Sequence, residues 1–247
     1  MKKGLISIFF FFLLCSCSPQ NKVSKLIIEN KVLSKEFCQE ASCAEVFFSW
    51  PSIASGPHKE KINTEILNKL AVYASFEEEP GMDLNTAVES FLNEFRNFKN
   101  DFPDASSGWS IEVKAEVSFD SLGILSVIFQ EYNYTGGAHP NSSKTFLNFD
   151  KLKGNLLSNQ EIVSDEASLL KLVEDEFRSF HEIDENIEIL EDDRFFIPES
   201  GFALARAIGY SGNHLLLIYN PYEIGPYVMG STEIKIPLNR LKGIVRF

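Results

Sequence analysis

The 247-residue sequence predicts an α+β fold, in which three main helices pack on antiparallel β-sheet. Apolar and polar residues alternate over 111–119, and a second apolar run follows over 124–134, which together indicate a hairpin. Apolar residues recur instead at helical spacing over 62–74, 88–102 and 169–180. Because strands follow one another through short turns and helices are inserted as whole blocks, antiparallel pairing is expected.

The elements before the hairpin begin with two short strands. Residues 25–28 are suited to a first strand and residues 46–48 to a second, which should stop at Pro51 because proline donates no hydrogen bond to a neighbouring strand. The first helix runs from His58 to the Glu-Glu-Glu-Pro-Gly segment at 77–81.

The second helix has Asn85 as its candidate N-cap, and the turn at 120–123 closes the predicted hairpin. A further strand is expected at 145–149. The third helix should begin near Ser164, a natural N-cap residue. The remaining predicted strands are 195–197, 215–219 and 233–236.

The first sixteen residues have the order of an export signal, because Lys2 and Lys3 precede an apolar run over 5–14. That run is about half the roughly 20 residues that a membrane-spanning helix needs. Leu14-Cys15-Ser16-Cys17 resembles the bacterial lipobox, in which a leucine stands three residues before a lipidated cysteine. We therefore expect a signal peptide over 1–16 and a lipid on Cys17; an ordinary secretory signal is the alternative.

Residues 17–33 are expected to form a tether, and residues 34–247 a single α+β domain with halves at about 34–122 and 123–247. The net charge of −12 becomes more negative once Lys2 and Lys3 are removed. This charge excludes a nucleic-acid partner, which needs a basic surface. It would attract a cationic partner, or it serves solubility alone.

Cys38 and Cys43 are the two remaining cysteines after Cys17. In an oxidising compartment a pair spaced this closely forms a local disulfide. A zinc site is the weaker alternative, because no matching pair of histidines lies nearby in the sequence.

Motifs for catalysis are missing from the sequence. It contains no phosphate-binding Gly-rich loop, and the glycines of Gly209-Tyr210-Ser211-Gly212 are too close for a nucleophile elbow. His181-Glu182 is not followed by a second histidine at zinc-protease spacing. We therefore predict no catalytic residue, no metal site, no cofactor and no enzymatic activity.

Two segments rich in tyrosine and glycine, 132–141 and 219–230, are the candidate binding surface. Tyrosine suits recognition because it combines apolar area with a polar tip. The alternative is structural, since glycine and proline are typical of tight turns. The candidate residues are Tyr132, Tyr134, Gly136, Gly137, His139, Tyr222, Glu223 and Tyr227.

These segments, with Asn148-Phe149-Asp150 and the earlier Trp50-Pro51 and Ile62-Asn63, make residues 38–247 resemble the RsiV-like extracytoplasmic domain family. That family includes the domain of a lysozyme-sensing anti-sigma factor and domains that precede the catalytic domain of some peptidoglycan deacetylases. The resemblance implies an α+β domain outside the cytoplasm. Pro140 departs from the glycine of many relatives, and neither a spanning helix nor a catalytic domain is visible, so we expect the module without signalling or catalysis.

The sequence thus predicts a lipid-anchored binding module of the bacterial cell envelope. Its expected partner is a cationic lysozyme-like muramidase or a cell-wall glycan. The alternatives are a cell-wall hydrolase or deacetylase that uses His139 with a carboxylate, and a structural protein without a ligand. Ser18-Pro19-Gln20 lacks the aspartate that often marks inner-membrane retention, which favours the outer membrane.

Overall fold

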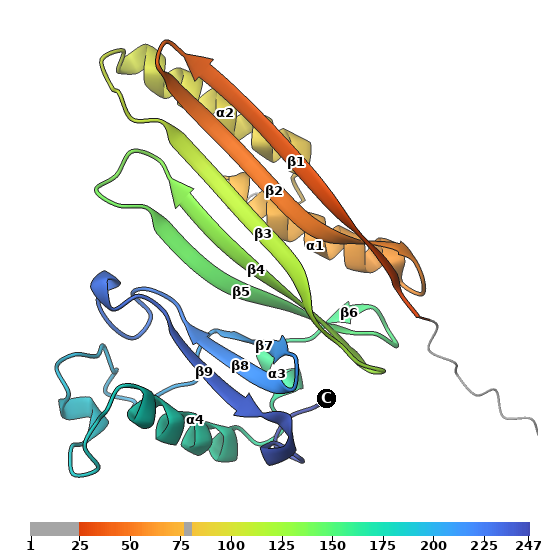
Figure 1. Cartoon of the computed structure of the whole chain (residues 1–247), viewed down its shortest axis with the longest axis vertical. Helices are drawn as coiled ribbons and strands as arrows, with labels where there is room; N and C mark the ends of the chain where they lie inside the picture. Colours follow the sequence, from red (N-terminus) through yellow and green to blue (C-terminus); the bar gives the residue numbers. More distant parts are fainter. Residues whose placement is uncertain (1–24, 77–80) are drawn as a thin grey trace, which may run out of the picture.

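The computed structural model of the chain describes residues 25–76 and 81–247 and shows two stacked lobes (Figure 1). The first lobe contains a six-stranded sheet of order β1-β2-β3-β4-β5-β6, and the second a three-stranded sheet of order β7-β8-β9. The predicted α+β class is confirmed. The predicted signal peptide and the lipidation site at Cys17 lie outside the described residues.

The larger sheet is mixed rather than wholly antiparallel. Its strands are β1 (Ile27–Gln39), β2 (Ser42–Ser55), β3 (Trp109–Asp120), β4 (Ile124–Tyr134), β5 (Asn141–Asp150) and β6 (Asn155–Leu156). Every neighbouring pair is antiparallel except β2 and β3, which run parallel. A parallel pair needs a long crossover, and the two helices between β2 and β3 supply it.

Helices α1 (Lys59–Ala74) and α2 (Leu84–Asp101) cover one face of the larger sheet (Figure 1). Their apolar stripes and the inward side of the predicted hairpin form one buried core, with Leu70, Phe95 and Phe129 fully enclosed. The N-cap of α2 is Asp83 rather than Asn85. The Asp83 carboxylate accepts the backbone N–H groups of Asn85 and Thr86, which a side chain at position 85 does not do.

Strand β2 continues through Pro51, where the sequence predicted its end. The pairing of β2 with β3 stops at Ser49, so beyond this residue one edge of β2 faces no strand. Ile53 directs its N–H and C=O to that same edge, where they bond the side-chain amide of Asn63 at 2.7 and 3.0 Å. Pro51 has the same orientation two residues earlier, so its missing N–H breaks no ladder hydrogen bond.

We expect Asn63→Ala to lower the free energy of unfolding by about 1–2 kcal/mol, because it leaves a half-buried N–H and C=O of Ile53 without partners. Urea denaturation of the purified chain measures the change. Thr64→Ala is the matched control, since its hydroxyl bonds only the carbonyl of Glu60 on the exposed side of the same helix. An equal loss in both variants would contradict the role given to Asn63.

The second lobe consists of β7 (Ala207–Ser211), β8 (His214–Tyr219) and β9 (Thr232–Pro237), with α4 (Glu166–Phe180) packed on the side away from the larger sheet (Figure 1). Phe177 of α4 is fully buried against Phe195, Phe202 and Tyr219. The short elements are α3 (Asn159–Ile162) and the 3-10 turns η1 (Ile189–Glu191), η2 (Tyr227–Met229) and η3 (Leu238–Arg240).

Two local predictions in this lobe are wrong. The N-cap of α4 is Asp165, whose carboxylate accepts the N–H of Ser168, and not Ser164. Residues 195–197 form no strand. Phe195 turns inward onto Phe177, and the next residue donates its N–H to a loop carbonyl, so the apolar run serves packing instead of a ladder.

The predicted boundaries also move. Strand β1 begins at Ile27, so the last part of the expected tether (17–33) belongs to the sheet, of which β1 is an outer strand (Figure 1). The expected division at 122/123 falls inside the β3–β4 hairpin, and the second lobe begins only after β6. Cys38 and Cys43 lie opposite each other on β1 and β2 and are joined by a disulfide.

The two lobes are joined by a buried polar network and a small apolar cluster. Asn148 of β5 is 4% exposed; it accepts the Ser126 hydroxyl at 2.7 Å and donates to the Ile208 carbonyl of β7 at 2.9 Å. Beside it, Phe146 packs against β7 and β8. The polar network fixes the position of β7 over β5.

A carboxylate also joins the lobes. Asp150, at the end of β5, is 3% exposed and accepts a hydrogen bond from the Arg246 guanidinium at 2.8 Å. Its other oxygen accepts the N–H groups of Leu152 and Lys153 in the turn that follows.

Among the described residues, no helix combines the length and apolar character needed to cross a membrane.

Candidate functional site

The two tyrosine-rich segments meet in space, although they lie in different lobes. The His139 ring, in the β4–β5 loop, stacks on the Tyr227 ring with 3.9 Å between centroids and 20° between planes. Its Nε2 lies 3.3 Å from the Tyr222 hydroxyl. The Tyr227 hydroxyl donates to the carbonyl of Pro140 at 2.8 Å. We call His139, Tyr222 and Tyr227 the aromatic cluster.

Tyr222 has 56% of its surface exposed, and His139 is also exposed. Its φ of 69° lies in the left-handed region, which a residue with a side chain rarely adopts. The hydrogen bonds of neighbouring Glu223 hold this conformation: its carboxylate accepts the N–H groups of Arg206 at 2.7 Å and Asn220 at 3.0 Å. Strained backbone of this kind concentrates at binding sites.

The other predicted site residues have different surroundings. Tyr132 is 43% exposed on β4 and lines a groove across the open face of the larger sheet, next to Glu112. Tyr134 pairs with Ser110 of β3. Within the described chain, neither tyrosine makes a ring contact or hydrogen bond with the aromatic cluster.

The paired glycines and Glu223 support the loops. Gly136 has a φ of +91°, so the turn needs a glycine there. A Cβ at Gly137 would meet only the His139 carbonyl, at 3.8 Å. Glu223 has both oxygens occupied by backbone donors, as described above, and so fixes the loop that presents Tyr222. The structural alternative therefore applies to Gly136 and Glu223.

Asn220 is a site residue that sequence reasoning missed. Its side-chain amide pairs with the backbone of β5 as a neighbouring strand would, since Lys144 donates to Oδ1 at 2.7 Å and its carbonyl accepts from Nδ2 at 2.9 Å. This clamp carries the β8–β9 loop to the edge of the larger sheet. In the sequence, the feature that could have identified Asn220 is its position directly before Pro221, in a loop that follows a buried strand.

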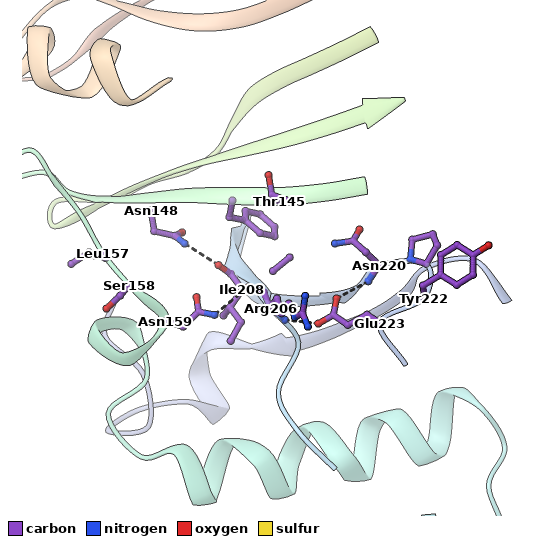
Figure 2. A pocket seen from close by; sticks show the side chains of 13 residues that line it. Thr145, Asn148, Leu157, Ser158, Asn159, Arg206, Ile208, Asn220, Tyr222 and Glu223 are labelled. Carbon is purple, nitrogen blue, oxygen red and sulfur yellow. Dashed lines mark hydrogen bonds between the residues drawn. The ribbon is translucent and has the colours of Figure 1, made fainter. Parts of the chain in front are cut away.

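A cleft of about 460 Å³ lies between the lobes beside the aromatic cluster (Figure 2). Its walls come from β5, from the segment around α3, from β7 and from the β8–β9 loop. Tyr222, a member of the aromatic cluster in that loop, also lines the cleft. Figure 2 shows Arg206 and Asn159 on the wall opposite β5. Because four distant segments build the cleft, no local sequence pattern marks it.

The chemistry of this region is hydrogen bonding and stacking. Arg206 lines the cleft, and its guanidinium forms no ion pair with any residue in 25–76 or 81–247. Behind the loop, burial raises the pKa of Tyr219 well above its usual range, so its hydroxyl stays protonated and donates to the Ala203 carbonyl. The described residues contain no group of three His, Cys, Asp or Glu side chains arranged to hold a metal ion.

Two family models match the chain, one over much of each lobe. The model described as "Deacetylase PdaC" matches residues 37–142, and the model described as "Protein of unknown function (DUF3298)" matches residues 155–239. The peptidoglycan-N-acetylmuramic acid deacetylase PdaC of Bacillus subtilis is 23% identical over 173 residues, which are 66% of this chain and 36% of the relative. The chain thus spans about a third of that relative's length.

Two solved structures have the same fold. A DUF3298 family protein from Pseudomonas aeruginosa superposes with a TM-score of 0.68 at 22% identity, over 91% of this chain and 96% of the other. A DUF3298 family member from Bacteroides fragilis gives 0.70 at 20% identity, over 91% and 95%. These two similarities show the fold of both lobes, while the family models match a PdaC-type region in the first lobe and a DUF3298-type region in the second.

Proposed function

We propose that this PdaC/DUF3298-type domain is a non-catalytic binding module of the bacterial cell envelope, held to a membrane by a lipid on Cys17. One observation carries the proposal: His139 and Tyr222, 83 residues apart in the sequence, lie side by side and present exposed aromatic surface at the mouth of a cleft. Exposed aromatic groups beside a polar cleft are typical of recognition sites.

The ligand we propose is a peptidoglycan component. The Bacillus subtilis relative is a peptidoglycan-N-acetylmuramic acid deacetylase, and this chain spans only about a third of that protein. A module shared with an enzyme that works on the cell wall suits wall binding. A lysozyme-like muramidase is the second candidate; the RsiV-like resemblance and the net charge of −12, which would attract a cationic enzyme, support it.

A deacetylase or hydrolase using His139 would need a carboxylate or a metal beside this ring. The hydrogen-bond and ring partners of His139 in the described chain are Tyr222, Tyr227 and the carbonyl of Pro140. These groups orient the imidazole but provide neither a base nor metal ligands. We therefore keep binding, and not catalysis, as the proposed activity.

Removing the exposed aromatic ring should weaken binding. We expect Tyr222→Ala to lower the affinity for purified peptidoglycan roughly tenfold or more, because truncating a central aromatic residue of an interface costs about 2 kcal/mol. Co-sedimentation of the full chain with peptidoglycan measures this, and titration with lysozyme in low and moderate salt tests the second candidate.

Leu122→Ala is the matched control, since Leu122 is 79% exposed at the β3–β4 turn, far from the cluster along the strands. It should bind like the unchanged chain. Full-strength binding by Tyr222→Ala would remove the aromatic cluster as the site, and no binding of the unchanged chain to either peptidoglycan or lysozyme would remove the proposed function.

The lipid anchor has a separate test. Mass spectrometry of the chain purified from bacterial membranes should show a mature N-terminus at Cys17 with attached acyl groups. A chain that retains Met1, or a Cys17 without acyl groups, would contradict this part of the proposal.

A further inference from the structure

The outer edge of β5 has an open hydrogen-bonding position inside the interlobe cleft. In an antiparallel pair, residues alternate between those bonded to the partner strand and those whose N–H and C=O point away from it. Lys144 points away from β4, because both its groups bond Asn220. Phe146, two residues later and opposite Ile128, has the same orientation, so its N–H and C=O face outward.

Both neighbours of this position are occupied by the protein itself. The Asn220 amide takes the position at Lys144, and the Leu157 N–H donates to the Asn148 carbonyl at 2.7 Å. Between them, no group in the described part of the chain bonds the outward N–H and C=O of Phe146. Phe146 and both flanking partners line the same cleft.

The geometry of Asn220 shows what fits the open position. An amide group bonds a strand edge with its carbonyl on the N–H and its N–H on the carbonyl, at 2.7 and 2.9 Å for Asn220 and Lys144. A ligand amide placed at Phe146 would make the same two bonds, one strand position further along. Peptide ligands commonly bind an exposed sheet edge in this way.

A cation lies on the opposite wall. Arg206 presents a guanidinium without an ion-pair partner in the described chain, although acidic residues outnumber basic ones by 35 to 23 over the sequence. Asn159 and Ser158 lie beside it on this wall. A guanidinium with neighbouring polar groups selects a carboxylate.

We propose that the interlobe cleft binds a secondary amide carried next to a carboxylate, with the amide on the Phe146 backbone and the carboxylate on Arg206. This ligand class rests on the proposed function and narrows it to one part of peptidoglycan. N-acylated sugar acids and short peptides both have this chemistry. The volume of about 460 Å³ lies within the range of about 300–1,000 Å³ usual for small-molecule sites.

Amide NMR of the ¹⁵N-labelled full chain tests the contact directly, with N-acetylmuramic acid as one probe and the dipeptide alanyl-glutamate as the other. The bound probe should shift the Phe146 amide resonance and slow its hydrogen exchange at least tenfold. The Lys144 amide, already bonded to Asn220, should keep its exchange rate. The probe that produces the effect identifies the source, sugar acid or peptide.

The carboxylate contact has its own variant. Arg206→Gln should weaken the probe's affinity roughly tenfold, because a hydrogen bond to a charged group is stronger than one between neutral groups. Arg96→Gln, at an exposed position of α2 in the first lobe, is the matched control and should leave the affinity unchanged. The methyl ester of N-acetylmuramic acid should bind the unchanged chain and Arg206→Gln equally.

The outcomes separate this inference from the proposed function. If the chain sediments with whole peptidoglycan but neither probe affects the Phe146 amide, the cleft assignment is wrong while the binding function stands. If a probe affects Phe146 and Arg206→Gln binds it as tightly as the unchanged chain, the carboxylate contact is wrong. If neither peptidoglycan nor a probe binds, both proposals fail.

Discussion

Gly209→Val should lower the free energy of unfolding by about 3 kcal/mol, the upper end of the usual cost of overpacking a core contact. Gly209 lies on β7 directly against Phe146 of β5. A Cβ at Gly209 would lie 2.2 Å from Cγ and Cδ1 of Phe146 and 2.8 Å from its Cβ. These atoms belong to the fixed part of the ring and its stem, so the two sheets would have to separate.

Urea denaturation followed by circular dichroism measures this change. Gly123→Val is the matched control, because no atom lies within 4 Å of a Cβ built there and its φ is not in the left-handed region. Phe146→Ala combined with Gly209→Val should recover part of the lost stability, since the smaller side chain removes the clash. Equal midpoints for Gly209→Val and Gly123→Val would contradict the close contact between the sheets.

Asp150→Ala should have the second-largest effect, a loss of about 2–3 kcal/mol. Asp150 is buried, and its removal leaves the N–H group of Leu152 and the Arg246 guanidinium without their partner, while the Lys153 N–H keeps its bond to the backbone carbonyl of residue 150. Breaking a buried ion pair costs about 3–5 kcal/mol, and the partial exposure of Arg246, 39% of its side chain, reduces this figure. Thermal and urea unfolding of the purified chain measure it.

The same carboxylate should make stability depend on pH. Burial acts to raise the pKa of Asp150, but hydrogen bonds from Arg246 and from the backbone amides outweigh burial, and the pKa is lowered. A depressed pKa stabilises the fold above the unfolded-state value of about 3.9, and this contribution is lost as the pH falls through the folded-state value. Asp150→Asn should therefore lose less stability than the unchanged chain between pH 5 and pH 3.

Asp104→Asn, a change at an exposed carboxylate of the first lobe, serves as the control for this pH series. Its loss of stability on acidification should match that of the unchanged chain. If Asp150→Asn followed the same curve as the unchanged chain, the Asp150–Arg246 pair would have no part in acid sensitivity.

The elements predicted correctly are those whose residues repeat locally. Val113 and Ala115 alternate with polar residues along β3 because one side of this strand meets α1 and α2, and both helices were visible from their apolar spacing. The N-caps were misplaced by one or two residues. Asp83 and Asp165 are as suitable for capping as Asn85 and Ser164, and the sequence alone does not show which side chain turns toward the helix.

The features missed depend on contacts between distant residues. The parallel pairing of β2 with β3 depends on the helices between them, and strand β7 is short and is held by Asn148 of the other lobe. The same limit applies to the site. The sequence identified His139 and Tyr222 as candidates, but their meeting depends on how Asn220 clamps its loop to β5.

The outer strand β1 bears on how separate molecules behave when they are crowded. The free edge of an outer strand can pair with a strand of another chain and so extend a sheet from one molecule into the next. Exposed Glu29, Lys31 and Glu36 lie along β1, and Lys35 pairs with Glu89 of α2. Sheet growth through this strand would have to dehydrate these charges, so the chain should resist fibrous self-association even at high local concentration.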